Sequence, residues 1–368
     1  MKIVRIESFP IRVPRAQRFQ AAQGVLTHSD FAVVVVETDA GMTGYGEISS
    51  ALFYYRLGPA HARDVNDYLA PALVGEDPLR IPALVERMDR ALRGARQAKS
   101  GVEMALWDIA GKAAALPIYR LLGGKVREAV PLNWTVGFET PEATAEQAAH
   151  YVERYRVRSV RLKIGRPGDT DARACEAVRK RLGPDFPIRV DANEYYRSPK
   201  EAVAALRRLE PFGLHLAEQP LGETDLAGHA EVRAAVSIPI ILDESIQTPG
   251  DAIAAVGARA ADAFNVYVSE SGGLLRACQI IAIGDAAGVP CLIGTMGELQ
   301  IASAAGAHLG VACVNIPYTC DLVGPLRYDE SIIDETLRIE DGLFYPPEAP
   351  GLGVTPNWDV INRYRQPL

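Results

Sequence analysis

The stretch from 161 to 267 holds five polar segments in succession: Arg161-Leu-Lys163, Asp191-Ala-Asn193, Glu218-Gln-Pro220, Asp243-Glu-Ser245 and Asn265-Val-Tyr267. Each segment ends a short apolar run, and 24 to 28 residues separate the successive ends at positions 163, 191, 218, 243 and 267. A parallel strand, a helix and two loops occupy about that length, so the repeat is one strand–helix unit. Such strands converge with their carboxyl ends at the mouth of a (β/α)8 barrel. The stretch therefore predicts one lysine and three carboxylates facing each other there.

Length and composition bound the class of protein. The chain has 368 residues, which exceeds the ~250 of a barrel and predicts a second module. A net charge of −7 argues against a nucleic-acid partner. The run from Leu299 to Ile316 has no charged residue apart from His308. Its Ala, Gly and Ser content favours a buried barrel helix leading into a strand over a membrane span.

Cysteine usage indicates the compartment. The five cysteines lack zinc-ligand spacing, and an odd number suits reduced thiols, so we expect a cytoplasmic protein. Charged residues and Pro10 interrupt the N-terminal segment, from which we expect no signal peptide. Barrels of this size often associate, and we expect a homo-oligomer.

The first 125 residues predict an α+β capping domain. Apolar alternation near 3–13, 30–39 and 42–47 predicts three antiparallel strands, and the period becomes helical from Gly58 to Ala115. The polar segment from Arg15 to Ser29 reads as a mobile loop between the first two strands. Loops over a barrel mouth set specificity, so we expect this segment and the one from Glu47 to Tyr55 to select the substrate.

Residues 126–325 predict the barrel. Helix starts are marked by a hydroxyl residue before proline at Thr140-Pro141, Ser198-Pro199 and Thr248-Pro249. Strand seven is predicted at Pro290–Ile293 and strand eight at Val311–Ile316. The Pro-rich segment 326–368 is predicted to pack back on the capping domain.

The three carboxylates Asp191, Glu218 and Asp243 would repel one another at one mouth unless a cation lay among them. Ligation by oxygen alone favours Mg²⁺, with Mn²⁺ as the second candidate. The alternative is that these side chains form salt bridges or cap helices. Their occurrence in three consecutive repeats favours the metal site.

Lys163 would lie beside that cation and could act as a general base, since a nearby positive charge makes an ammonium give up its proton more readily. Arg161 shares the strand face with Lys163, because side chains alternate along a strand. It is a candidate to hold a substrate carboxylate through two hydrogen bonds, or to form an ion pair inside the barrel.

Tyr267 holds the equivalent position on strand six. Its phenol could donate a proton or a hydrogen bond, or the ring could simply shape the pocket wall. The remaining candidates flank the mouth, where they would line the pocket or support the residues that do. They are Asn193, Glu244, Glu298, Asp321, Trp134, Thr135 and, from the early loop, His28.

These motifs together resemble the muconate-lactonizing-enzyme subgroup of the enolase superfamily, the mandelate racemase/muconate lactonizing enzyme family. The resemblance includes the three carboxylate segments and four further motifs. These are Gly44-Tyr-Gly-Glu47, Ala105-Leu-Trp-Asp-Ile-Ala-Gly-Lys112, Leu121-Leu-Gly-Gly-Lys125 and Ser271-Gly-Gly273. It implies an α/β fold, a modified (β/α)7β TIM-type barrel under an α+β cap that the C-terminal tail completes. It also implies Mg²⁺ on the three carboxylates and removal of the proton α to a carboxylate.

Two departures from the family pattern affect the expected reaction. The family's Lys-x-Lys on strand two reads Arg161-Leu-Lys163, and its lysine on strand six is replaced by Tyr267. Racemases and epimerases of this subgroup use one lysine on each side of the α-carbon, and that pair is missing here. Strand seven offers Gly294-Thr-Met instead of a histidine, and the Asp-x-Asp of dipeptide epimerases reads Asp321-Leu-Val323.

The main hypothesis is therefore a reaction on one face of a small hydroxy or amino carboxylate. Lys163 removes the α-proton, and Mg²⁺ and Arg161 hold the enediolate. A β-leaving group then departs with the help of protonated Lys163 or of Tyr267, which describes a syn dehydratase (a lyase) or a cycloisomerase. The first alternative is a racemase or epimerase in which Tyr267 is the second acid or base. The second is a barrel that binds metal and carboxylate without catalysis.

Overall fold

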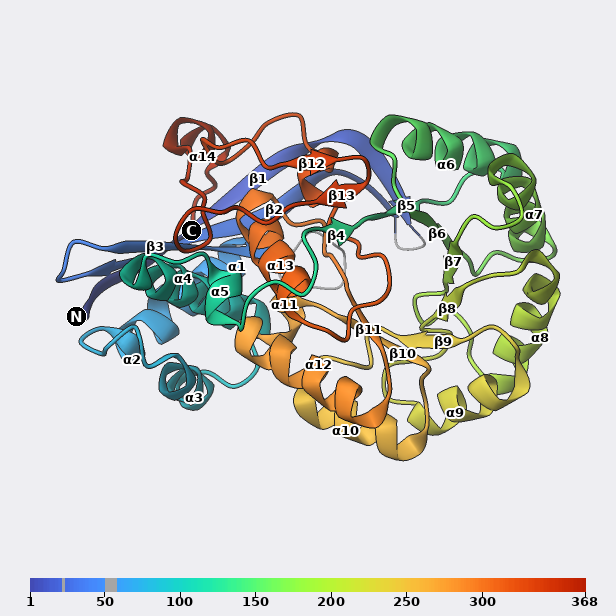
Figure 1. Ribbon diagram of the computed structural model, residues 1–368, viewed down its shortest axis with the longest axis horizontal. Coiled ribbons are helices and arrows are strands. Elements are labelled where there is room, and N and C mark those ends of the chain that lie inside the picture. Colours follow the sequence, from blue (N-terminus) through green and yellow to red (C-terminus); the bar gives the residue numbers. More distant parts are fainter. Residues whose placement is uncertain (22–23, 50–57) are drawn as a thin grey trace.

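The computed structural model describes residues 1–21, 24–49 and 58–368, and the side chains of these residues except 17–21 and 24. Its N-terminal part is an antiparallel sheet in the order β1-β2-β3. The strands are β1 (Ile3–Ala21), β2 (Gly24–Thr38) and β3 (Thr43–Ser49). In Figure 1 the sheet begins to the left of the barrel, and β1 and β2 run across the top of the view toward β5.

The prediction of a loop from Arg15 to Ser29 is wrong, because most of this segment belongs to the paired strands β1 and β2. β1 and β2 pair as far as Ala21 and Gly24, with a register shift between Pro14 and Phe19. The described side chains of Val25, Thr27 and His28 are exposed, so this part of β2 carries no apolar alternation although the backbone is paired. Of the second expected specificity loop, residues 50–55 lie outside the described residues.

Helices cover one face of the sheet and complete the cap. Gly46 lies so close to α4 that a Cβ there would meet the Gly101 carbonyl oxygen at 1.9 Å, so glycine is required for this approach. In α3, the buried residues Ile81, Leu84, Val85 and Met88 recur at helical spacing. The cap helices are α1 (Gly58–Arg63), the π-helix η1 (Asp64–Leu69), α2 (Ala70–Leu73), α3 (Ile81–Ala91), α4 (Arg96–Ala114) and α5 (Ile118–Leu121).

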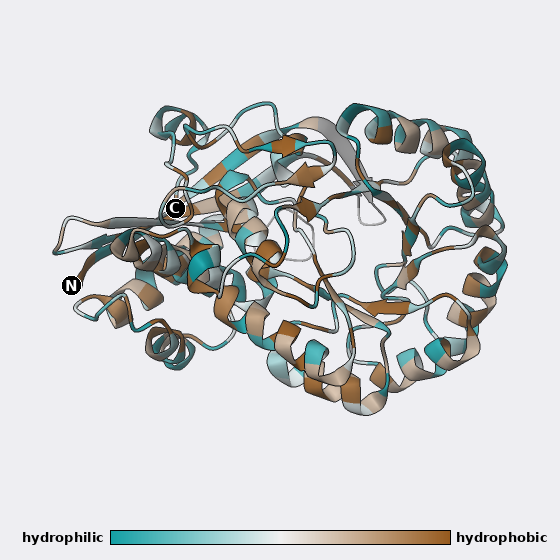
Figure 2. Cartoon of the chain, viewed as in Figure 1, coloured by the Kyte–Doolittle hydropathy of each residue, from teal (hydrophilic) through white to brown (hydrophobic). Residues whose placement is uncertain are grey.

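The barrel is a curled parallel sheet in the order β11-β10-β9-β8-β7-β6-β5, surrounded by helices (Figure 1). Its strands are mostly hydrophobic, while the outer helices mix hydrophobic and hydrophilic residues (Figure 2). The strands are β5 (Asn133–Val136), β6 (Ser159–Lys163), β7 (Ile188–Asp191), β8 (Leu216–Glu218), β9 (Ile240–Leu242), β10 (Ala263–Val266) and β11 (Cys291–Ile293).

Helices alternate with these strands, and three begin where the sequence predicts. Thr140, Ser198 and Thr248 each accept a hydrogen bond from a backbone N–H in the first turn. The helices are α6 (Pro141–Tyr155), α7 (Thr170–Leu182), α8 (Pro199–Leu209), η2 (Glu210–Phe212), α9 (Leu226–Ala235), α10 (Pro249–Ala258), α11 (Val268–Ser271), α12 (Leu274–Ala287) and α13 (Gln300–Ala312).

The prediction of an eighth strand at Val311–Ile316 is wrong, because α13 extends to Ala312. The eighth position is taken by a short segment around Cys320, which forms a parallel bridge to Leu132. The Asp321 N–H donates to the Ile293 carbonyl oxygen at 2.9 Å, which joins this segment to β11 and closes the ring. In a continuous apolar run, periodicity alone cannot show where a buried helix ends.

The C-terminal segment crosses the base of the barrel and reaches the cap. After the 3-10 helix η3 (Gly324–Arg327), β12 (Ile339–Glu340) pairs with β13 (Leu343–Phe344), and β13 pairs with β4 (Val130–Pro131). α14 (Trp358–Tyr364) follows, and the Gln366 N–H donates to the Pro10 carbonyl oxygen at 2.8 Å. The exact domain boundaries at 125 and 325 stay a prediction. Among the described residues, no helix combines the length and apolar composition needed to span a bilayer.

Candidate active site

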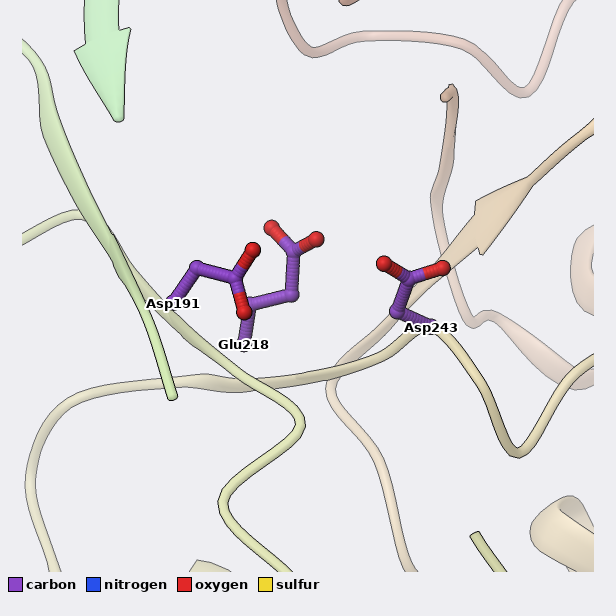
Figure 3. Close-up of side chains that lie close together, drawn as sticks. All are labelled: Asp191, Glu218 and Asp243. Carbon is purple, nitrogen blue, oxygen red and sulfur yellow. The ribbon is translucent and has the colours of Figure 1, made fainter. Parts of the chain in front are cut away.

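Three buried carboxylates meet at the carboxyl ends of neighbouring strands. Asp191 ends β7, Glu218 ends β8 and Asp243 directly follows β9. One carboxylate oxygen from each lies within 4.8 Å of the others. Figure 3 shows the three side chains turned toward a common space. The predicted convergence of these residues is thus present, and their separation allows all three to bind one ion.

The electrostatics of this group also fit a cation. Burial first, and then the charges of Glu244 and Glu218, raise the pKa of Asp243 well above its ordinary value. Burial also raises the pKa of Glu218, and its Oε2 atom has no hydrogen-bond partner among the described residues. A divalent cation would offset this repulsion and satisfy that oxygen.

Lys163 lies at the edge of the triad. Its Nζ atom is 2.5 Å from Asp191 Oδ2 and 2.5 Å from Asn193 Oδ1, and its side chain is 12% exposed. Asn193 in turn donates to Glu244 Oε1 at 2.9 Å. Burial, followed by the charge of Asp191, raises the pKa of Glu244 to about 8. The lysine is therefore fixed beside the metal-binding group and does not extend into bulk water.

Arg161 is engaged by carboxylates of the protein. Its Nη1 atom lies 2.5 Å from Glu218 Oε1 and 3.2 Å from Asp321 Oδ2, and Nε donates to Thr135 Oγ1 at 3.1 Å. Burial opposes the charged form of Arg161, but these acids and Asp191 outweigh it and raise the pKa of Arg161 further. This geometry is the internal ion pair that the sequence left open as the alternative to substrate binding.

Asp321 lies inside the barrel and does not line the mouth. Its Oδ1 atom accepts hydrogen bonds from Arg189 Nη2 and Asn133 Nδ2, each at 2.5 Å. Together with Arg161 these residues form a buried polar network beneath the triad. Such a network fixes the orientation of the side chains it includes.

Tyr267 and Lys163 contact different members of the triad, Asp243 and Asp191. The Tyr267 hydroxyl donates to Asp243 Oδ2 at 3.0 Å, and burial followed by the charge of Asp243 raises the pKa of Tyr267 well above its ordinary value. A Cβ on Gly294 would come within 2.4 Å of the Tyr267 ring, so the glycine after β11 makes room for it. These surroundings favour the neutral phenol, which acts as the hydrogen-bond donor to Asp243.

The remaining candidate residues differ in burial and in their distance along the chain from the triad. Glu298 is buried and accepts hydrogen bonds from Thr295 Oγ1 and from the Met296 N–H, so it shapes the loop after β11. Trp134 and Thr135 lie on β5. His28 is exposed on the hairpin, and within the described chain its side chain contacts Thr27 but none of the site residues.

Two supporting residues were missed by the sequence analysis. Gln219 accepts from the Asp243 N–H at 2.8 Å and donates to Ser245 Oγ at 2.7 Å, which ties the loop after β8 to the loop after β9. Its φ of 37° is in the left-handed region, as is that of Asn193 at 41°, and such strain clusters at functional sites. Asn265 donates to Glu218 Oε1 at 3.1 Å. Its position two residues before Tyr267, on one strand face, was the available signal.

Comparisons with known proteins agree with this geometry. The N-terminal domain model of the mandelate racemase / muconate lactonizing enzyme family matches residues 5–123, and the enolase C-terminal domain-like model matches residues 143–360. The N-succinyl-L-Arg/Lys racemase of Bacillus cereus is 30% identical over 362 residues, which cover 98% of this chain and 97% of the racemase.

Solved structures are similar over nearly the whole chain. The muconate lactonizing enzyme from Pseudomonas fluorescens, complexed with muconolactone, has a TM-score of 0.95 at 30% identity and covers 99% of both chains. The dipeptide epimerase from Enterococcus faecalis, complexed with Mg and the dipeptide L-Leu-L-Tyr, has a TM-score of 0.91 at 31% identity. The match covers 96% of this chain and 100% of the epimerase. These relatives are thus a racemase, a lactonizing enzyme and an epimerase.

Proposed function

The chain belongs to the mandelate racemase / muconate lactonizing enzyme family of the enolase superfamily, and on that premise we propose that it removes the proton α to a carboxylate, with Lys163 as the base. The observation that carries this proposal is the position of Lys163, whose Nζ atom lies 2.5 Å from a member of the carboxylate triad.

Asp191, Glu218 and Asp243 are the proposed ligands of Mg²⁺, with Mn²⁺ as the second candidate. Support comes from their mutual distances, from the unpartnered Glu218 Oε2 and from the Mg in the structure of the dipeptide epimerase. When bound, a divalent cation supplies the positive charge that stabilises the enediolate left after the proton is removed.

The protein's own residues would act on one face of the substrate. The neutral Lys163 amine takes the α-proton and becomes an ammonium. In a syn elimination it returns that proton to the departing hydroxyl, which leaves as water, and the amine is neutral again. In a cycloisomerisation the same lysine delivers or removes the proton of the ring-forming step. Burial and the charge of Asp243 raise the pKa of Tyr267, which favours the neutral phenol and so a role as hydrogen-bond donor rather than base.

The second candidate is racemisation or epimerisation by Lys163 and Tyr267. It is favoured by the relatives that are named racemases and epimerases. It requires the Tyr267 phenol to donate a proton to the opposite face and to be reprotonated in each cycle. Loss of configuration at the α-carbon without elimination would distinguish it from the main proposal.

The test is solvent exchange followed by proton NMR. Mg²⁺-loaded protein is incubated in D₂O with a panel of small hydroxy and amino carboxylates, and the loss of the α-proton signal is measured. We expect Lys163→Ala to lower the exchange rate by about 10²- to 10⁴-fold, the usual contribution of a general base. Lys125→Ala, which removes a lysine that contacts Glu128 and Glu348 instead, is the control. Full turnover by Lys163→Ala would refute the assignment. Turnover of any acid by the wild type would exclude a barrel that only binds.

Two broader expectations remain proposals. A cytoplasmic location is supported by the five cysteines, all of which are free thiols. The homo-oligomer expected from the sequence stays a prediction.

A further inference from the structure

A chain of buried charges lies inside the barrel, and the proposed reaction gives no role to two of its members, Asp321 and Arg189. Asp321 is 1% exposed and Arg189 is 2% exposed. The Asp321 Oδ1 atom accepts a hydrogen bond from Arg189 Nη2 at 2.5 Å, and its Oδ2 atom lies 3.2 Å from Arg161 Nη1. Asp321 therefore joins two arginines that come from neighbouring strands, β6 and β7.

Arg161 connects this chain of charges to the triad. Its Nη1 atom lies 2.5 Å from Glu218 Oε1, 3.2 Å from Asp321 Oδ2 and 3.6 Å from Asp191 Oδ2. One guanidinium nitrogen thus contacts two proposed metal ligands and one acid that is not a ligand. A cation at the triad has to share the negative charge of Glu218 and Asp191 with Arg161, and like charges a few ångströms apart repel. An acid that balances the charge of Arg161 therefore favours the cation.

The two oxygens of Glu218 are used differently. Oε1 accepts from Arg161 Nη1 at 2.5 Å and from Asn265 Nδ2 at 3.1 Å. Oε2 is buried and has no hydrogen-bond partner among the described residues. The donors of the protein are gathered on one oxygen, which leaves the other to an ion. The position of Arg161 thus matters for the ligand as well as for its charge.

The charges of Asp321 and Arg189 both reach Glu218, with opposite signs. Burial is the main cause of the raised pKa of Glu218. Arg161 and Arg189 oppose this shift, whereas Asp191 and Asp321 add to it. Loss of the Asp321 charge therefore makes the triad less attractive to a cation, and loss of the Arg189 charge makes it more attractive.

We propose that Asp321 is a positioning residue for the metal site, which balances the charge of Arg161 and so raises the affinity of the triad for a divalent cation. Arg189 acts in the opposite sense, because its positive charge binds Asp321 and also reaches Glu218. The pair sets how tightly the ion is held without contacting it. This inference rests on the proposed function, which places Mg²⁺ on the triad.

The test is isothermal titration calorimetry of Mg²⁺ alone into protein stripped of metal with EDTA. Asp321→Asn should weaken Mg²⁺ binding about tenfold or more, because a negative charge close to a doubly charged ion is lost. Arg189→Met should tighten Mg²⁺ binding about threefold or more for the converse reason. The double variant Asp321→Asn/Arg189→Met removes one charge of each sign and should bind Mg²⁺ within about threefold of the wild type.

These signs separate an electrostatic role from a merely structural one. Damage to the barrel would weaken Mg²⁺ binding in both single variants and weaken it further in the double variant. If Asp321→Asn does not fold, Arg189→Met and the double variant still decide, because replacing both members of a buried ion pair is tolerated better than replacing one.

Asp262→Asn is the matched control. Asp262 also pairs with an arginine, Arg233, whose Nε atom lies 2.7 Å from Asp262 Oδ1, but it directly precedes β10 at the end of the strand away from the mouth. Its loss should change Mg²⁺ affinity by no more than about twofold, since a partly exposed pair has little effect at a distance.

The inference is overturned if both single variants weaken Mg²⁺ binding, or if neither changes it by more than the control does. In either case Mg²⁺ binding by the wild type still supports the proposed metal site. If the wild type binds no Mg²⁺, the result contradicts both proposals.

Discussion

At the residue scale, Lys163 and Tyr267 differ in their exposure and in the carboxylate that each contacts. Lys163 is partly exposed at the mouth and contacts Asp191, while Tyr267 is buried and donates its single hydroxyl proton to Asp243. A base must release and regain a proton in every cycle, which suits the lysine. A buried phenol beside a carboxylate suits a fixed hydrogen-bond donor.

Tyr267→Phe should separate these two roles. The substitution keeps the ring that packs against Gly294 and removes the hydrogen bond to Asp243. We expect the α-proton exchange rate in D₂O to stay within about tenfold of the wild type, whereas Lys163→Ala falls by about 10²-fold or more. If Tyr267→Phe abolished exchange as completely as Lys163→Ala, the two-base reaction of a racemase would be favoured instead.

The sequence predicted the triad and its lysine because spacing places strand-end residues at one mouth. It could not decide between the two roles of Arg161, because an ion pair across the barrel depends on Asp321 and Glu218, which lie far away in the chain. Gln219 and Asn265 were missed for the same reason. Both residues act through hydrogen bonds to other strands, and a glutamine or an asparagine alone does not indicate a metal or substrate ligand.

At the scale of elements, two buried glutamates of the cap bind the starts of barrel helices. Glu47 of β3 accepts from the backbone N–H groups of Leu299 and Ala302 at the start of α13. Glu103 of α4 does the same for Leu274 and Leu275 at the start of α12. Backbone donors at a helix start favour a carboxylate, so these contacts join the cap to the barrel.

Glu47→Gln should therefore alter the pH dependence of stability. Burial, which outweighs the hydrogen bonds, raises the folded-state pKa of Glu47 to about 7 from 4.5. The folded state then holds this proton more tightly than the unfolded state, so the contribution of Glu47 to stability falls as pH rises from about 4.5 to 7. The free energy of unfolding, from urea titrations between pH 5 and 8, should decline less steeply in Glu47→Gln. Between pH 5 and 8, the decline in the free energy of unfolding should differ between Glu47→Gln and the wild type by at most about 3 kcal/mol.

Glu37→Gln on the neighbouring strand β2 is the control for this measurement, because Glu37 lies on the cap sheet without capping a helix. Parallel pH profiles for Glu47→Gln and the wild type would contradict the account of Glu47.

Elements marked by local sequence signals were predictable, whereas an element held only by contacts distant in the chain was not. The helix starts at Thr140, Ser198 and Thr248 depend on local chemistry, and all three are confirmed. The eighth strand consists of a few residues around Cys320 that only the closed ring holds in place, so no local pattern indicates it.

At the scale of the whole molecule, cap and barrel share one hydrophobic cluster, and the cap has a second cluster of its own. Ile11, Phe31 and Met104 of the cap pack in the same buried cluster as Leu132 and Trp134 of the barrel. A cavity of about 700 Å³ beside the mouth is lined by Arg15 of the cap and by Trp134 of the barrel, so the cap helps to form this space. The architecture was predictable from the repeat and the resemblance, while the shape of that space depends on a hairpin that the sequence analysis read as a loop.

The central claim is that a single cation is held at the barrel mouth by Asp191, Glu218 and Asp243, next to Lys163. Anomalous diffraction from crystals soaked in Mn²⁺ tests it most directly, because manganese replaces Mg²⁺ at oxygen sites and its position can be seen without assumptions about the ligands. The account predicts one strong peak about 2.1 Å from an oxygen of each of the three carboxylates, with the Lys163 amine facing the open side. No peak among the three carboxylates, or a peak bound elsewhere while they pair with Arg161 and Lys163 alone, would contradict it.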